Sequence, residues 1–133
     1  MKAETDLRIL LREMKPELNE GEYVYCLAAS REQLFSLETL CSFREKEGWT
    51  MILPREKADS LNIPYQTICA WITLTVHSAL EAVGLTAAVS QALTESNISC
   101  NVVAAFYHDH IFVPIKNADS AMKVLHKLSR NNQ

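Results

Sequence analysis

The residues best placed to bind a charged small molecule lie around Gly84, between a loop and a predicted helix over residues 85–93. Free backbone amides at a helix start can hold a carboxylate, and the helix dipole favours that negative charge. Gly84 would admit a ligand close to the backbone or supply a positive φ angle. Leu85 and Thr86 begin the helix, and the Thr86 hydroxyl could add a hydrogen bond. The alternative is a plain turn in which Thr86 only caps its own helix.

Two further polar residues could complete such a site. Asp109 is predicted at the tip of a hairpin, where its carboxylate could pair with an ammonium or guanidinium group. Aspartate is also favourable in turns for purely structural reasons. Asn101 alternates with Cys100 and Val102 in a predicted strand. It could therefore bind the backbone of a ligand or be an ordinary polar strand residue.

Catalytic and metal chemistry find little support in the sequence. His108 and His110 share strand parity, but no third ligand stands at a convincing spacing, so we predict no metal site. His77 and Ser78 are adjacent, and neighbours in an extended segment point apart, so we predict no catalytic residue and no enzyme. The chain has only 3 glycines and no glycine-rich phosphate loop, and we predict no cofactor.

Hydrophobic periodicity outlines the elements that must position these residues. Thr5 is the expected N-cap of a first helix, which Pro16 limits. The remaining helices are predicted after Pro54, over residues 85–93 and over residues 118–129, with strands at about 23–29, 37–43, 49–53, 72–76, 98–106 and 110–115. Residues 30–36 leave room for little more than a turn.

An internal repeat organises these elements. The run Ile52-Leu53-Pro54 followed by Ala58-Asp59-Ser60 recurs as Phe112-Val113-Pro114 followed by Ala118-Asp119-Ser120, and every position is shifted by the same amount. Self-similarity of this kind indicates duplication. Two strand–helix–hairpin–helix units predict an α+β fold, in which helices cover one face of an antiparallel sheet.

Composition narrows the classes of partner. The net charge is −3 without a basic stripe, which argues against nucleic acid. No apolar run approaches the roughly 18 residues of a membrane span, and the first residues lack a signal-peptide core, so we expect a cytoplasmic protein and no membrane partner. The 4 cysteines show no CxxC spacing and are expected to be free thiols.

The Gly-Leu-Thr-Ala run at residues 84–87 and the His-Asp-His-Ile-Phe-Val-Pro run at residues 108–114 resemble the ACT domain family of amino-acid-binding regulatory modules. The chain is similar to small bacterial proteins with tandem ACT domains, to the regulatory ACT domains of aspartate kinases and to cytosolic arginine sensors. This resemblance implies two ferredoxin-like βαββαβ repeats. It also implies that Asp109 lies beside the ligand, as the matching aspartate of the arginine sensors does.

These observations predict a regulatory sensor with an N-terminal ACT-like repeat over residues 1–63 and a C-terminal ACT repeat over residues 64–133. We expect an amino acid to bind at the junction of the repeats or between two chains, at Gly84, Leu85, Thr86, Asn101 and Asp109. A homodimer is expected because exposed sheet edges favour self-pairing. The alternative function is a dimerisation or protein-interaction module without a ligand.

Overall fold

The computed structural model describes residues 5–133, which form two compact units. Unit 1 comprises residues up to Asn19 together with Ala70–Gln133, and unit 2 comprises Glu20–Cys69. Unit 2 is therefore inserted in the sequence between two parts of unit 1. The predicted division after residue 63 follows the repeats along the chain and remains a prediction.

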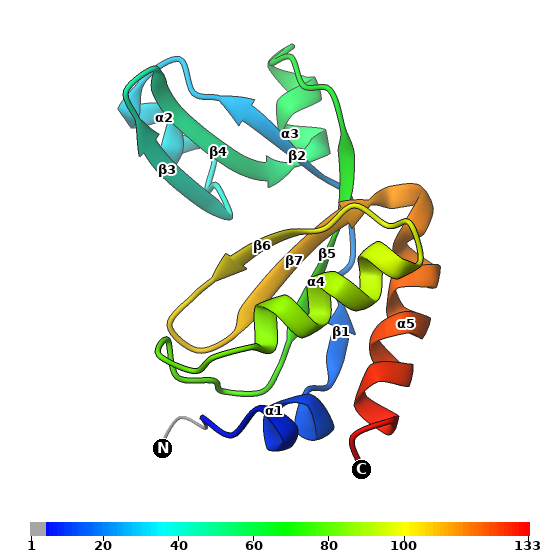
Figure 1. Cartoon of the computed structure of the whole chain (residues 1–133). Helices are drawn as coiled ribbons and strands as arrows, with labels where there is room; N and C mark the ends of the chain where they lie inside the picture. Colours follow the sequence, from blue (N-terminus) through cyan, green and yellow to red (C-terminus); the bar gives the residue numbers. More distant parts are fainter. Residues whose placement is uncertain (1–4) are drawn as a thin grey trace. The chain divides into compact units, whose positions relative to one another are not determined.

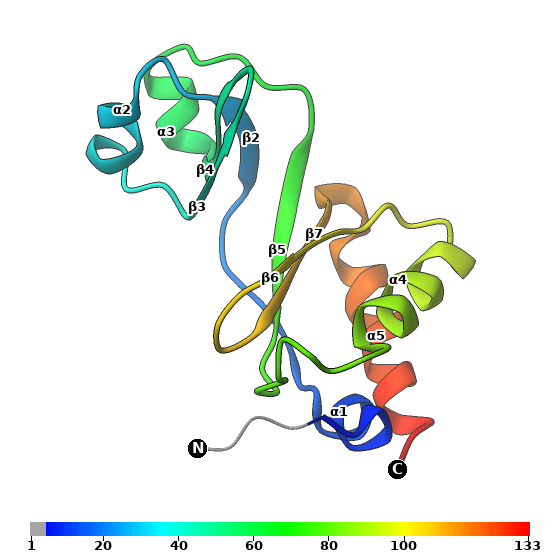
Figure 2. The ribbon, with the colours of Figure 1, turned by 60° about the vertical axis from the view of Figure 1, so that its left-hand side comes forward.

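Unit 1 is an antiparallel sheet with helices on one face, as Figures 1 and 2 show for α4 and α5. Its strands run in the order β1-β5-β7-β6. Three helices supply side chains to one core with β5 and β7, and residues at its centre are Leu10, Ile72, Leu93, Ile111 and Leu125. The elements of unit 1 are α1 (Leu7–Glu13), β1 (Pro16–Leu18), β5 (Ile68–Leu74), α4 (Leu85–Glu95), β6 (Asn101–Ala104), β7 (Asp109–Pro114), the 3-10 helix η1 (Ile115–Asn117) and α5 (Ala118–Arg130).

Unit 2 repeats this plan on a smaller scale. Its strands run in the order β3-β4-β2, and β2 also pairs with Ile68 and Cys69, the residues of β5 that belong to unit 2. A core of Val24, Cys26, Leu34, Met51, Leu53 and Ala58 joins its helices to the sheet. Its elements are β2 (Tyr23–Leu27), α2 (Arg31–Ser36), β3 (Cys41–Glu45), β4 (Gly48–Pro54) and α3 (Arg55–Ser60).

The two hairpins have the same register. Arg44 pairs with Trp49 in β3 and β4, and Ala104 pairs with Asp109 in β6 and β7, so both partners keep the offset of the sequence repeat. Pro54 and Pro114 end the second strands with nearly equal backbone angles, φ −57° and ψ 136° against φ −54° and ψ 138°. Duplication is thus visible in the pairing of the strands as well as in the sequence.

The helices that follow these two prolines begin differently. Asp59 lies near the end of the 6-residue helix α3, whereas Asp119 is the second residue of the 13-residue helix α5, which η1 precedes. Asp59 and Asp119 are nevertheless each the fifth residue after the proline, and we predict that they occupy equivalent positions in the two repeats.

Several predicted boundaries are wrong for identifiable reasons. Asp6, rather than Thr5, caps α1, because its carboxylate accepts hydrogen bonds from the amides of Arg8 and Ile9. The first helix does end before Pro16, as predicted, but Pro16 also opens an edge strand, where its missing N–H costs no ladder hydrogen bond. Residues 31–36 form a helix of 6 residues in place of a turn, because Ser30 caps it.

The sequence predicts that Leu85, Ala88, Val89, Ala92 and Leu93 form one face of α4 that packs on the sheet of unit 1, and this is confirmed in part. Leu85, Val89 and Leu93 are buried in the core, and Cys100 and Val102 pack against it. Ala104 is exposed, because it ends β6 at the rim of a pocket. All 4 cysteines are free, as expected. Within the described residues, no helix is long and apolar enough to cross a membrane.

Candidate ligand-binding site

A small pocket in unit 1 brings together four of the five predicted site residues. Gly84, Leu85 and Thr86 line it at the start of α4, and Asp109 lines it at the start of β7. Its volume is about 100 Å³, well below the roughly 300–1,000 Å³ typical of complete ligand sites. The pocket can therefore hold the polar end of a small ligand.

The start of α4 is open to an anion. Gly84 occupies the N-cap position with φ 105°, and no side chain caps the helix there. Thr86 is exposed and does not cap its own helix, so its hydroxyl is not used in the way that the alternative role of a helix cap requires. The first-turn amides, together with the dipole of an 11-residue helix, are thus available to a carboxylate at this end of the pocket.

Asp109 is buried, which corrects its predicted place at a hairpin tip. The turn is closed one residue earlier, by a hydrogen bond from the Ala105 amide to the His108 carbonyl, so Asp109 becomes the first residue of β7. The residue is only 7% exposed, and its side chain makes no hydrogen bond or ion pair among residues 5–133. Burial raises the pKa of this carboxyl, while His110 and His108 oppose the rise. An added cation in the pocket would favour its ionised form.

Asn101 does not join the other four. It pairs with Phe112 at the far end of β6, whereas Ala104 at the near end lines the pocket. It is exposed, which agrees with an ordinary polar residue of an edge strand.

The sequence missed one polar residue of the pocket. Ser78 lines it and is 8% exposed, in a segment that carries no periodic pattern. The neighbouring His77 ring packs against Tyr107 of the β6–β7 turn, with centroids 5.7 Å apart. The loop and the turn on either side of the pocket are therefore in contact.

His110 anchors the strand that carries Asp109. The indole N–H of Trp71 donates to His110 Nδ1 at 3.0 Å, and Thr73 Oγ1 lies 3.2 Å from the same atom. Asn19 donates to Thr73 Oγ1 at 3.0 Å. Because the Trp71 nitrogen can only donate, Nδ1 must carry a free lone pair, and the proton of the neutral ring sits on Nε2. The alternation of Trp71 and Thr73 in β5 is the sequence signal for this polar face.

This network predicts a loss of stability in acid. Burial, followed by the nearby His108, lowers the pKa of His110, while Asp109 raises it. Because the pKa of His110 is lower in the folded chain, the unfolded chain binds more protons as the solution becomes acidic. The stability that neutral His110 contributes is therefore complete above pH 6.5, its ordinary pKa, and declines as the pH falls below that value. We expect urea melts between pH 7 and 5 to show a smaller decline for His110→Gln, whose amide oxygen still accepts from Trp71. An equal decline in both proteins would contradict this role.

The two histidines have no metal-site geometry. His108 Nδ1 lies 3.4 Å from the Val76 carbonyl, and His110 Nδ1 faces Trp71. In the part of the chain that the structure describes, no group of three or more His, Cys, Asp or Glu residues is arranged to hold a metal ion.

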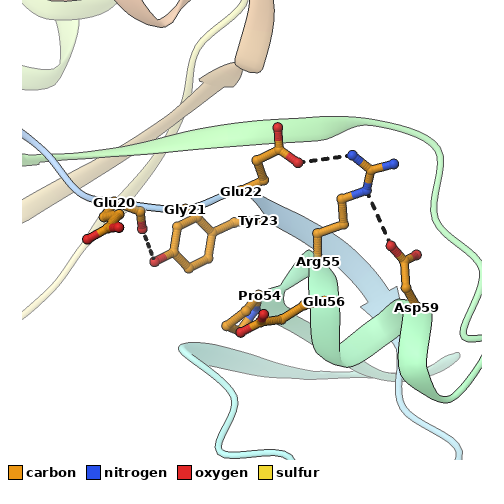
Figure 3. Close-up of a pocket in the computed structure, with 8 residues that line it drawn as sticks. All are labelled: Glu20, Gly21, Glu22, Tyr23, Pro54, Arg55, Glu56 and Asp59. Atoms are coloured by element: carbon orange, nitrogen blue, oxygen red, sulfur yellow. Dashed lines mark hydrogen bonds and ion pairs between the residues drawn. The ribbon is translucent and has the colours of Figure 1, made fainter.

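A second, larger hollow of about 620 Å³ lies in unit 2, where Glu22 and Asp59 flank the Arg55 guanidinium (Figure 3). Arg55 Nη1 lies 2.9 Å from Glu22 and its Nε lies 3.4 Å from Asp59. The Tyr65 hydroxyl accepts from Arg55 Nε at 2.9 Å and donates to Asp59 at 2.7 Å. Arg55, Glu22, Asp59 and Tyr65 thus pair with one another and connect α3 to the segment before β2. A structural role accounts for these charged residues without a ligand.

Comparison with known proteins shows which family has this fold. One model of the ACT domain matches residues 2–70 and a second matches residues 66–127. A Vibrio cholerae protein of unknown function, described as a possible transport protein, is 45% identical, with 92% of this chain and 95% of that chain covered and a TM-score of 0.84. No curated protein shows significant sequence similarity.

Two more distant structures share the fold alone. An Agobacterium tumefaciens protein is 16% identical, with 87% of this chain and 89% of that chain covered and a TM-score of 0.63. The ligand-free regulatory subunit of aspartate kinase from Thermus thermophilus is 9% identical, with 85% and 95% covered and a TM-score of 0.61. ACT domains are typically regulatory sensors of small molecules. The chain belongs to the ACT domain family and contains two such domains in tandem.

Proposed function

We propose that the chain is a regulatory sensor of an amino acid, bound in the pocket of unit 1 between the start of α4 and Asp109. The observation that carries this proposal is Asp109, a largely buried residue whose carboxylate lines the pocket and has no hydrogen-bond or ion-pair partner in the described chain. It lines the same pocket as the uncapped helix start. One end of the pocket thus favours an ammonium group and the other a carboxylate, which is the charge pattern of a zwitterion.

The first repeat lacks these features, so we infer one such site per chain. The common hairpin register puts Trp49 where the second repeat has Asp109. Ser30 Oγ accepts from the Gln33 amide at the start of α2, and Gln33 Oε1 accepts from the Ala29 amide. This helix start is therefore satisfied by its own side chains.

The second candidate function is a protein-interaction module. Exposed apolar side chains occupy the loop and the turn that flank the pocket, namely Leu80, Val83, Phe106 and Tyr107. Apolar groups gathered in this way favour contact with a protein. The homodimer remains a prediction that agrees with them, and a small pocket could be completed by a second chain. The cytoplasmic location also remains a prediction, supported by the free cysteines.

A thermal-shift screen of the twenty amino acids identifies the ligand, since a ligand that binds only the folded state stabilises it. Calorimetry with that amino acid then tests Asp109→Asn. We expect affinity to fall about tenfold to a hundredfold, because a charge-assisted bond contributes roughly 1.5–3 kcal/mol. Asp119→Asn, on α5 and outside the pocket, is the matched control.

Stability without ligand separates a binding role from a structural one. A buried carboxylate with a raised pKa makes the folded state less stable once the pH exceeds that pKa, so Asp109→Asn should melt no lower than the wild type at pH 7. A lower melting temperature with unchanged affinity would show that Asp109 is structural. Failure of every amino acid to stabilise the protein would favour the interaction module.

A further inference from the structure

We propose a second binding site, in unit 2, for a small monocarboxylate with an apolar body and no ammonium group. A pocket of about 400 Å³ lies between α2 and the β3–β4 hairpin. Its volume is within the range of small-molecule sites. Arg31, Leu34, Phe35 and Trp49 form the part of the lining that carries the proposal.

The chemistry of this pocket is the reverse of that in the second repeat. Trp49 has the hairpin position of Asp109, so an indole replaces the carboxylate that would meet an ammonium group. Arg31 is the first residue of α2, as Leu85 is of α4, so a guanidinium replaces an apolar side chain. Duplication has thus produced two pockets with different preferences for charge.

Two hydrogen-bond donors in the pocket are unused. The Trp49 indole N–H and the Arg31 guanidinium make no hydrogen bond or ion pair within residues 5–133. A carboxylate accepts from both kinds of donor, and the bond to arginine is charge-assisted. Because Ser30 already caps α2, the anion would be held by these side chains.

The remaining walls select the body of the ligand. Leu34 is buried, Trp49 packs half-buried against the core of unit 2, and Phe35 is 80% exposed at the mouth. An apolar body would cover Phe35 and remove its surface from water. Glu38 also lines the pocket, and its carboxylate lies 4.0 Å from Lys57 Nζ, whose positive charge offsets it.

Calorimetry with phenylacetate tests the proposal, with 2-phenylethylamine and acetate as probes that change the charge or lack the apolar body. We expect phenylacetate to bind and the other two to bind at least tenfold more weakly. Arg31→Gln should weaken phenylacetate on the order of tenfold, and Trp49→Phe, which keeps a ring but loses the donor, severalfold. Arg8→Gln, in α1 of unit 1, makes the same charge change away from the pocket and should have no effect.

The following results would contradict the proposed site. Absence of phenylacetate binding, or equal losses in Arg31→Gln and Arg8→Gln, would remove the specific role of the pocket. Sedimentation in which Trp49→Phe changes the assembly state, with no phenylacetate binding, would identify a protein contact instead. The proposal is independent of the amino-acid site, because Asp109→Asn should leave phenylacetate affinity unchanged and Arg31→Gln should leave amino-acid affinity unchanged.

Discussion

Replacing Leu93 by alanine is expected to lower the free energy of unfolding by about 2–5 kcal/mol. Leu93 is 0% exposed on α4 and belongs to the core that joins three helices to the sheet of unit 1. The shorter side chain loses buried apolar surface and leaves a cavity, because neighbouring side chains relax only in part. The residue thus couples the helix that opens the ligand pocket to the sheet that carries Asp109.

Urea denaturation followed by circular dichroism measures this loss. Leu61→Ala removes the same atoms from a side chain that is 51% exposed, so it should change stability by much less. A loss below about 0.5 kcal/mol for Leu93→Ala would mean that the side chain is not packed as its position indicates.

The duplicated hairpin–helix segments could be predicted from the sequence because their information is local. Proline after an apolar strand fixes φ and removes a donor, so it marks the same transition in both copies. The offset of the sequence repeat then reappears in the strand pairing of the two hairpins. The buried face of α4, which carries Leu85, Val89 and Leu93, could be predicted for the same reason, since helical periodicity indicates a buried face without reference to distant residues.

Features that depend on distant segments could not be predicted. Pro16, Glu17 and Leu18 form a strand only because they pair with β5, which lies far along the chain beyond all the strands of unit 2. A short segment with a proline carries no alternating pattern. This pairing also assigns the N-terminal segment to unit 1, whereas the sequence alone suggested that it leads the first repeat.

The site was predicted in part, and the differences have physical causes. Helix-start chemistry located Gly84, Leu85 and Thr86 in the pocket, because a glycine before an amphipathic run is a local signal. Asp109 was predicted at the hairpin tip but is buried at the start of β7, since a shift of one residue in the turn moves a side chain from a loop into a strand. Asn101 was predicted as a site residue only because it alternates with Cys100 and Val102 along the strand. This alternation does not indicate at which end of the strand a pocket forms.

Gly84→Val is expected to abolish amino-acid binding and to destabilise the protein by about 1–3 kcal/mol. The φ angle of Gly84 is 105°, which a β-branched residue rarely adopts, and an added Cβ would lie 2.9 Å from Leu7 Cδ2. The new side chain would point at Leu7, which does not line the pocket, so it would reach the site by displacing the start of α4 and its amides. The same substitution therefore affects the backbone, the packing and the site.

Two variants separate these effects, with calorimetry for binding and thermal melts for stability. Gly21→Val places valine at φ 101° in unit 2, with its nearest neighbour 3.5 Å away, so it should lose stability but keep amino-acid affinity. Adding Leu7→Ala to Gly84→Val relieves the 2.9 Å contact and should recover part of any packing loss without restoring binding. Wild-type affinity in Gly84→Val would exclude the start of α4 as the carboxylate site. Binding restored by Leu7→Ala would instead show that Gly84 acts only through packing against Leu7, because the valine would still be held at a positive φ angle.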